Sequence, residues 1–168
     1  MDGIGSLNVL RAVIEPGGEE RLLIDGTEAY PGFRIDRYTL VESIIHEGEY
    51  EFYVCSCGEA GCAGIFVPQE VRYENNLIIW KVVEPKPEGE YRFDRDQYLD
   101  TLYEAFVRAD GFKQGEREDF NIGPFGFYLD TFTKCLARLA QWREMRRKAA
   151  SWEKIEKEHP YRAKPEER

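Results

Sequence analysis

The chain has 168 residues, of which 42% are hydrophobic and 33% charged, which is globular composition and excludes a disordered protein. At this length one domain can bury roughly 70% of the surface of its unfolded chain, so we expect a stable core that needs neither metal nor disulfides. No run approaches the roughly 20 apolar residues that span a bilayer, and residues 1–13 lack a secretion signal, so we expect a cytoplasmic protein.

The net charge of −9 is unevenly distributed. Residues 1–94 carry 8 basic and 18 acidic side chains, whereas residues 95–168 carry 15 and 14. An acidic surface repels phosphate backbones and anionic lipid, so binding to nucleic acid or membranes is disfavoured, and a partner protein with a basic surface is attracted. Solubility alone is the simpler explanation of such a charge.

The N-terminal part predicts a β-hairpin followed by a short helix. Two runs rich in Leu, Val and Ile, residues 7–14 and 21–24, flank the turn-forming residues 15–18. Apolar residues then recur at helical spacing from Asp36 to a stop at Gly48, although a strand is the alternative there.

The middle of the chain predicts an antiparallel meander. Residues 49–57 alternate charged and aromatic side chains, and residues 65–73 and 77–83 continue as strands joined by a tight turn at Asn75-Asn76. Prolines 85 and 87 should end the sheet, because proline donates no hydrogen bond to a neighbouring strand.

Two helices are predicted in the C-terminal part. Asp94 and Gln97 form a capping-box pattern ahead of a helix over 95–109, and a long amphipathic helix is predicted over 130–158. A loop rich in glycine and aromatic residues connects them. The expected fold class is therefore α+β: an antiparallel sheet of about five strands covered by two helices. Residues 1–159 should form a single domain and residues 160–168 a disordered tail.

The most specific motif is a cysteine hairpin. Cys55 and Cys57 share a strand face, and the C-x4-C interval to Cys62 can bring a third sulfur across a tight turn. In a reducing compartment we expect thiols or metal ligands rather than disulfides. A zinc site needs four ligands, and the candidates for the fourth are His46, Cys135 and His159. The alternative is that these cysteines fill a crowded glycine-rich turn as small apolar side chains, with no cofactor.

This part of the chain resembles a group of small uncharacterised bacterial proteins. The resemblance covers about residues 20–105 and rests on C-x-C-G-x-x-G-C-A-G at 55–64, then Trp80, Pro85 and Tyr91-Arg92-Phe93-Asp94 leading into a helix. It implies a bacterial or phage origin and the α+β arrangement, and it brings no established activity. By analogy of size and charge, some small acidic bacterial proteins of this build are immunity proteins against toxins.

The sequence offers little catalytic equipment, so we expect a protein that is not an enzyme. It has two histidines and no phosphate-binding glycine loop, and the best enzymatic alternative is a thiol reaction at Cys57 or Cys62. The hypothesis we favour is an acidic inhibitor or immunity protein that masks a basic surface of a toxin or effector. Outward-facing aromatic residues such as Tyr53, Phe66, Tyr73 or Trp80 would then retain the partner.

The predicted contacts with a partner are Glu49, Glu51, Glu70, Glu74 and Trp152. Trp152 lies in the later part of the long C-terminal helix, where it can dock on a partner or on a second copy of the chain. A homodimer through that helix is the third functional class, and packing of Trp152 on its own chain is the alternative.

Overall fold

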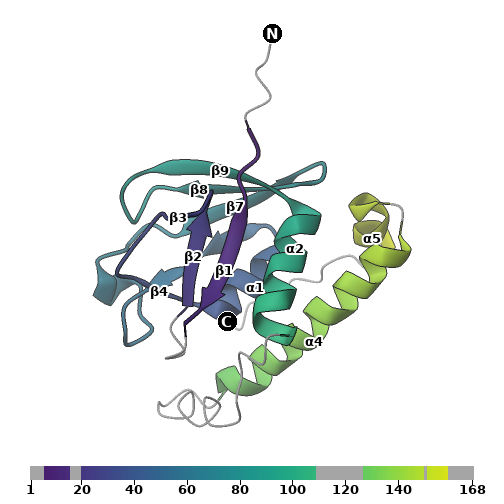
Figure 1. The fold of residues 1–168 in the computed structure, drawn as a ribbon. Coiled ribbons are helices and arrows are strands. Elements are labelled where there is room, and N and C mark those ends of the chain that lie inside the picture. Colours follow the sequence, from purple (N-terminus) through teal and green to yellow (C-terminus); the bar gives the residue numbers. More distant parts are fainter. Residues whose placement is uncertain (1–5, 16–19, 109–126, 150, 159–168) are drawn as a thin grey trace, which may run out of the picture.

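A computed structural model of the protein describes residues 6–15, 20–108, 127–149 and 151–158. Short antiparallel sheets occupy one side of the molecule, and the helices α2, α4 and α5 lie on the other side (Figure 1). This arrangement confirms the predicted α+β class. The loop preceding Phe127 and the C-terminal tail lie outside the described residues.

The N-terminal hairpin is confirmed and extended by a third strand. The strands are β1 (Leu10–Ile14), β2 (Glu20–Ile24) and β3 (Thr27–Glu28), paired antiparallel in that order. Asp25 and Gly26 have φ angles of 53° and 80°, the left-handed conformation that a two-residue hairpin turn between β2 and β3 requires.

The predicted short helix is α1 (Arg37–Ile45), which follows β4 (Arg34–Ile35). A carboxylate oxygen of Asp36 accepts the Thr39 amide at 3.2 Å, as expected of a residue that caps a helix.

The single strand predicted over 49–57 is instead two short strands in different sheets. They are β5 (Gly48–Tyr50), which pairs with β7, and β6 (Tyr53–Val54), which pairs with β4. Between them the Phe52 amide donates to the side-chain oxygen of Gln69 at 2.8 Å. A hydrogen bond to a side chain therefore takes the place of a backbone hydrogen bond between strands at this position.

The largest sheet has the strand order β5-β7-β8-β9. Its remaining strands are β7 (Gln69–Glu74), β8 (Leu77–Val82) and β9 (Gly89–Asp94). The tight turn is confirmed, because Asn75 adopts a φ of 56°. The prediction that the sheet ends at the prolines is wrong: Pro85 and Pro87 lie in the connection, and the chain returns as β9 along the whole length of β8.

The helical half comprises α2 (Arg95–Tyr103), continued by a π-helical turn η2 (Glu104–Arg108), then α4 (Phe127–Lys148) and α5 (Trp152–Glu158). Asp94 caps α2 by accepting the Gln97 amide at 2.9 Å. The reciprocal half of the capping box is not made: the Gln97 side-chain oxygen has no hydrogen-bond partner among the described residues, and its nitrogen donates to the Leu10 carbonyl. The long helix predicted over 130–158 is two helices: α4 ends at Lys148 and α5 begins at Trp152.

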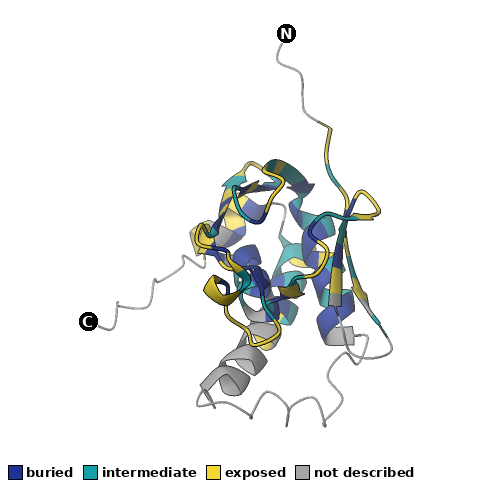
Figure 2. Cartoon of the chain, turned by 90° about the vertical axis from the view of Figure 1, so that its left-hand side faces the viewer, coloured by how far each residue is buried: buried dark blue, intermediate teal, exposed yellow. Residues whose placement is uncertain are grey.

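One hydrophobic cluster joins strands and helices from Leu10 to Ile155. Buried residues gather between the sheets and the helices, while the connecting turns are exposed (Figure 2). The largest fully buried side chains include Phe52, Tyr53, Trp80, Phe93 and Tyr98. None of the described helices is both long enough and apolar enough to cross a membrane.

Candidate metal centre

The cysteines lie on a turn that leaves β6 and is closed by backbone hydrogen bonds. The Cys55 amide donates to the Glu59 carbonyl at 3.2 Å, and the Ile65 amide donates to the Ala60 carbonyl at 3.0 Å. Between these bonds the 3-10 turn η1 (Gly61–Ala63) carries Cys62. Gly58 adopts a φ of 90° where the chain reverses, a conformation that a residue with a Cβ rarely takes.

This turn brings the three sulfur atoms together. The Sγ atoms of Cys55, Cys57 and Cys62 all lie within 4.8 Å of one another, so the predicted convergence is confirmed and the three residues lie close enough to bind a metal ion. Cys55 is half-buried, and the other two are exposed.

The expectation that all the cysteines are reduced differs from the structure, in which Cys55 and Cys57 form a disulfide and Cys62 is a free thiol. The C-x-C spacing places the two Cα atoms 5.3 Å apart, within the range that a disulfide spans. Because the thiolate is the metal ligand, the site is competent for metal only after reduction.

His46 is not part of this cluster. It follows the last residue of α1, its side chain is buried, and its carbonyl accepts the Tyr50 hydroxyl at 2.8 Å. Among the described residues the group of close metal-ligating atoms consists of the three cysteines, which corrects the prediction of His46 as a fourth ligand. The other two candidates fall outside what the structure describes: the side chain of Cys135, and His159.

The chain beyond the cysteine turn is held by a carboxylate that sequence reasoning missed. One carboxylate oxygen of Glu84 accepts the amides of Phe66 and Val67 at 2.6 and 3.0 Å. These two hydrogen bonds hold the pKa of Glu84 below its usual value. The sequence shows only that an acidic residue directly follows the predicted strand 77–83. That position does not reveal which backbone amides the Glu84 carboxylate binds.

Of the aromatic residues proposed to retain a partner, only Phe66 is largely exposed, at 79%. Tyr53 and Trp80 are buried in the core and Tyr73 is partly buried, so the first two are not available to a partner. Phe66 lies directly beyond the turn that carries Cys62.

Two of the four predicted acidic contacts, Glu70 and Glu74, form ion pairs with basic residues of other strands. On the outward face of the large sheet, Glu70 pairs with Lys81 and Glu74 pairs with Arg92, each at 3.9 Å. Glu90 pairs with both Arg72 and Arg92, at 3.3 and 3.1 Å. The outward face of this sheet therefore carries paired acidic and basic side chains and is not uniformly negative.

Two of the predicted acidic residues differ from the rest. Glu49 lies on β5 directly opposite Glu70, and Glu51 follows β5; both are exposed. Within the described ranges neither has an ion pair with a basic side chain. The uncompensated negative charge of this sheet is thus at its β5 edge.

Trp152 is packed on its own chain, which corrects its assignment as an exposed contact. Only 2% of it is exposed, its ring stacks on Trp142 with centroids 5.8 Å apart, and the Arg95 guanidinium lies 4.0 Å from its ring centroid. The indole N–H donates to Asp96 at 2.8 Å.

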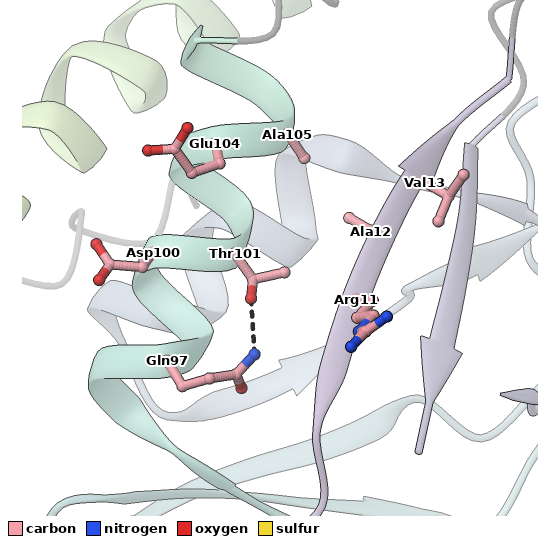
Figure 3. A pocket seen from close by; sticks show the side chains of 8 residues that line it. All are labelled: Arg11, Ala12, Val13, Gln97, Asp100, Thr101, Glu104 and Ala105. Atoms are coloured by element: carbon pink, nitrogen blue, oxygen red, sulfur yellow. Dashed lines mark hydrogen bonds between the residues drawn. The ribbon is translucent and has the colours of Figure 1, made fainter. Parts of the chain in front are cut away.

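A wide-open pocket of about 800 Å³ lies between β1 and α2 (Figure 3). Among its lining residues, Gln97 donates to Thr101 at 2.8 Å, while its side-chain oxygen is buried without a hydrogen-bond partner among the described residues. Asp100 and Glu104 pair with Arg143 and point away from β1 (Figure 3). A catalytic site would need several polar groups that converge in the cavity, and these two carboxylates do not point into it.

The fold and the site define an α+β protein with an exposed three-cysteine cluster. No family model, no curated protein and no solved structure matches the chain.

Proposed function

We propose that this chain is a zinc-binding interaction module without enzymatic activity, whose cysteine turn holds the ion. The observation that carries the proposal is the convergence of three Sγ atoms within 4.8 Å. Tetrahedral Zn–S bonds of about 2.3 Å place sulfur atoms about 3.8 Å apart, so small side-chain adjustments suffice to bind zinc. Thiolate ligands select zinc over the oxygen-preferring ions magnesium and calcium.

Zinc at this position would order the turn rather than create the fold. The three cysteines lie outside the hydrophobic cluster. The turn contributes Ala60 to that cluster, and Ile65, the first residue after the turn, also belongs to it. Metal removal should therefore loosen residues 55–64 and leave the three sheets and the helices in place. This differs from a zinc finger, which is unfolded without its metal.

The test is zinc content of protein reduced with a phosphine and then dialysed. We expect one zinc per chain by elemental analysis, and less than a tenth of that in Cys57→Ser and Cys62→Ser variants. Ser56→Ala is the matched control, because it changes the same turn without removing sulfur, and it should retain full zinc. Reduced wild-type protein without stoichiometric zinc would remove the proposal.

A second candidate, masking of a basic protein surface, is favoured by the acidic β5 edge. Glu49 faces Glu70 rather than a cation, and Glu51 extends the same edge, so a basic partner would relieve repulsion there. We expect the double variant Glu49→Lys, Glu51→Lys to lose a partner that the wild type retains at low salt. The control is the double variant Glu144→Lys, Glu158→Lys, which makes the same change of charge at exposed positions of α4 and α5. Equal recovery of the partner by the wild type and the double variant would contradict this function.

A further inference from the structure

The described residues offer three ligands, whereas a structural zinc site takes four. Since Cys57 and Cys62 are exposed, solvent reaches the side of the cluster that the turn does not occupy. A zinc ion held by these three sulfurs thus presents its remaining position outward, where a group from another molecule can bind.

The charge around the site selects the kind of group. Three thiolates and one Zn²⁺ carry a net charge of −1, and Glu59 and Glu84 add carboxylates on the turn and beyond it. One cation lies close, since Arg34 donates to the Ser56 carbonyl at 2.9 Å. A fourth ligand that is itself anionic would add to this negative excess, whereas a neutral imidazole would not.

An apolar contact lies beside the cluster. The Phe66 ring is 79% exposed, and an atom of that ring lies 3.9 Å from where a Cβ on Gly61 would be, next to Cys62 in the chain. Val67 is 39% exposed, and the Glu84 carboxylate fixes the backbone of both residues. A ring held in water by a fixed backbone is a suitable anchor for an apolar side chain of a bound segment.

We propose that a histidine-bearing segment of a partner protein completes the zinc site, with an apolar neighbour of that histidine packing on Phe66. This inference rests on the proposed zinc binding. It differs from the masking of a basic surface, because recognition here requires the ion, one imidazole and one aromatic ring, and it places the partner on the cysteine turn rather than at the β5 edge.

The test uses full-length protein reduced with a phosphine and loaded with Co²⁺, whose visible spectrum reports the ligand set. The probes are imidazole, N-acetylcysteine amide, and a short peptide with one histidine flanked by leucines. We expect imidazole and the peptide to change the spectrum saturably, the peptide at least tenfold more tightly than imidazole, and the thiol more weakly than imidazole.

Two variants separate the metal contact from the apolar contact. Phe66→Ala should weaken the peptide about tenfold and leave imidazole binding unchanged. Leu7→Ala removes an exposed apolar side chain elsewhere on the surface and should change neither.

If imidazole has no effect and Cys135→Ser or His159→Gln alters the cobalt spectrum, then the fourth ligand comes from this chain and the proposal is overturned. Tighter binding of the thiol than of imidazole would overturn the choice of histidine. Failure of the reduced protein to bind Co²⁺ or zinc would overturn the proposed function itself, and the inference with it.

Discussion

Replacement of Trp152 by alanine should be the most damaging single change in the C-terminal helices. The side chain is 2% exposed, and its ring lies between the Arg95 guanidinium and the ring of Trp142. Truncation of a buried tryptophan costs about 3–5 kcal/mol of unfolding free energy, because apolar contacts are lost and a cavity remains. Small domains have a total stability of about 5–15 kcal/mol, so the loss should shift the unfolding midpoint strongly.

Trp152→Phe is a milder change that removes the indole hydrogen bond and part of the ring volume. The variant keeps an aromatic ring but loses the donor to Asp96, which is 2.8 Å away. Asp96 still holds Arg146 through two hydrogen bonds of 2.7 and 2.8 Å, so its carboxylate is not left without a partner. We therefore expect a cost below that of Trp152→Ala, about 2 kcal/mol, from the lost hydrogen bond and the smaller ring.

The assay is urea unfolding followed by far-ultraviolet circular dichroism at 25 °C, combined with light scattering. Glu153→Ala is the control: this neighbour is exposed, and its replacement should change stability by less than about 0.5 kcal/mol. A loss below about 1 kcal/mol for Trp152→Ala would refute the docking of α5 on its own chain. A wild-type dimer that becomes a monomer in this variant would instead place Trp152 in an interface between copies, as the sequence-based hypothesis of a homodimer requires.

Three further predictions concern buried hydroxyl groups and the carboxylate beside the cysteine turn. Burial raises the pKa of Tyr53 and Tyr98 above the usual value of about 10, so the fold prefers their protonated forms and this stabilisation is lost as the pH rises above about 10. Absorbance at 295 nm should show ionisation of these tyrosines together with unfolding. Ionisation of all tyrosines near pH 10 in folded protein would contradict this prediction. Ser43→Ala removes a hydrogen-bond partner 2.9 Å from the Tyr98 hydroxyl in the core and should cost about 1–3 kcal/mol in urea unfolding, more than Tyr98→Phe, after which the Ser43 hydroxyl still donates to the Leu40 carbonyl. Because the pKa of Glu84 is lowered, its two hydrogen bonds persist at neutral pH and are lost only as the pH falls through that lowered pKa. The Phe66 amide resonance should therefore titrate at that pH in the wild type and not in Glu84→Gln.

The local elements were predictable where one pattern determined them. The alternation along β7, the apolar run of β8 and the left-handed turn at Asn75 are properties of a few adjacent residues. The break between α4 and α5 is not such a property, because residues 149–151 (Ala-Ala-Ser) do not by themselves end a helix. Contacts of Trp152 with Asp96 and Arg95, more than 50 residues away in sequence, accompany the change of direction.

The candidate site was predictable in its ligands but not in its surroundings. The C-x-C-x4-C spacing was enough to bring three sulfurs together. Charge counts could not reveal that Arg72 and Arg92 form ion pairs with Glu90 and Glu74, since cross-strand pairing depends on register. The same register places Ile79, which is fully buried on this charged face, directly between the two arginines.

The base of the cysteine turn is built independently of any ion. Gln69, fully buried, accepts the Phe52 amide at 2.8 Å on one side of the turn and donates to the Glu84 carbonyl at 2.6 Å on the other. Glu84 in turn holds the amides of Phe66 and Val67. Because both ends of the segment are anchored in the core, the binding free energy of a metal is not consumed in folding the domain. If zinc binds as proposed, the fold should form without the ion, and metal loading and partner binding at this turn should depend on each other.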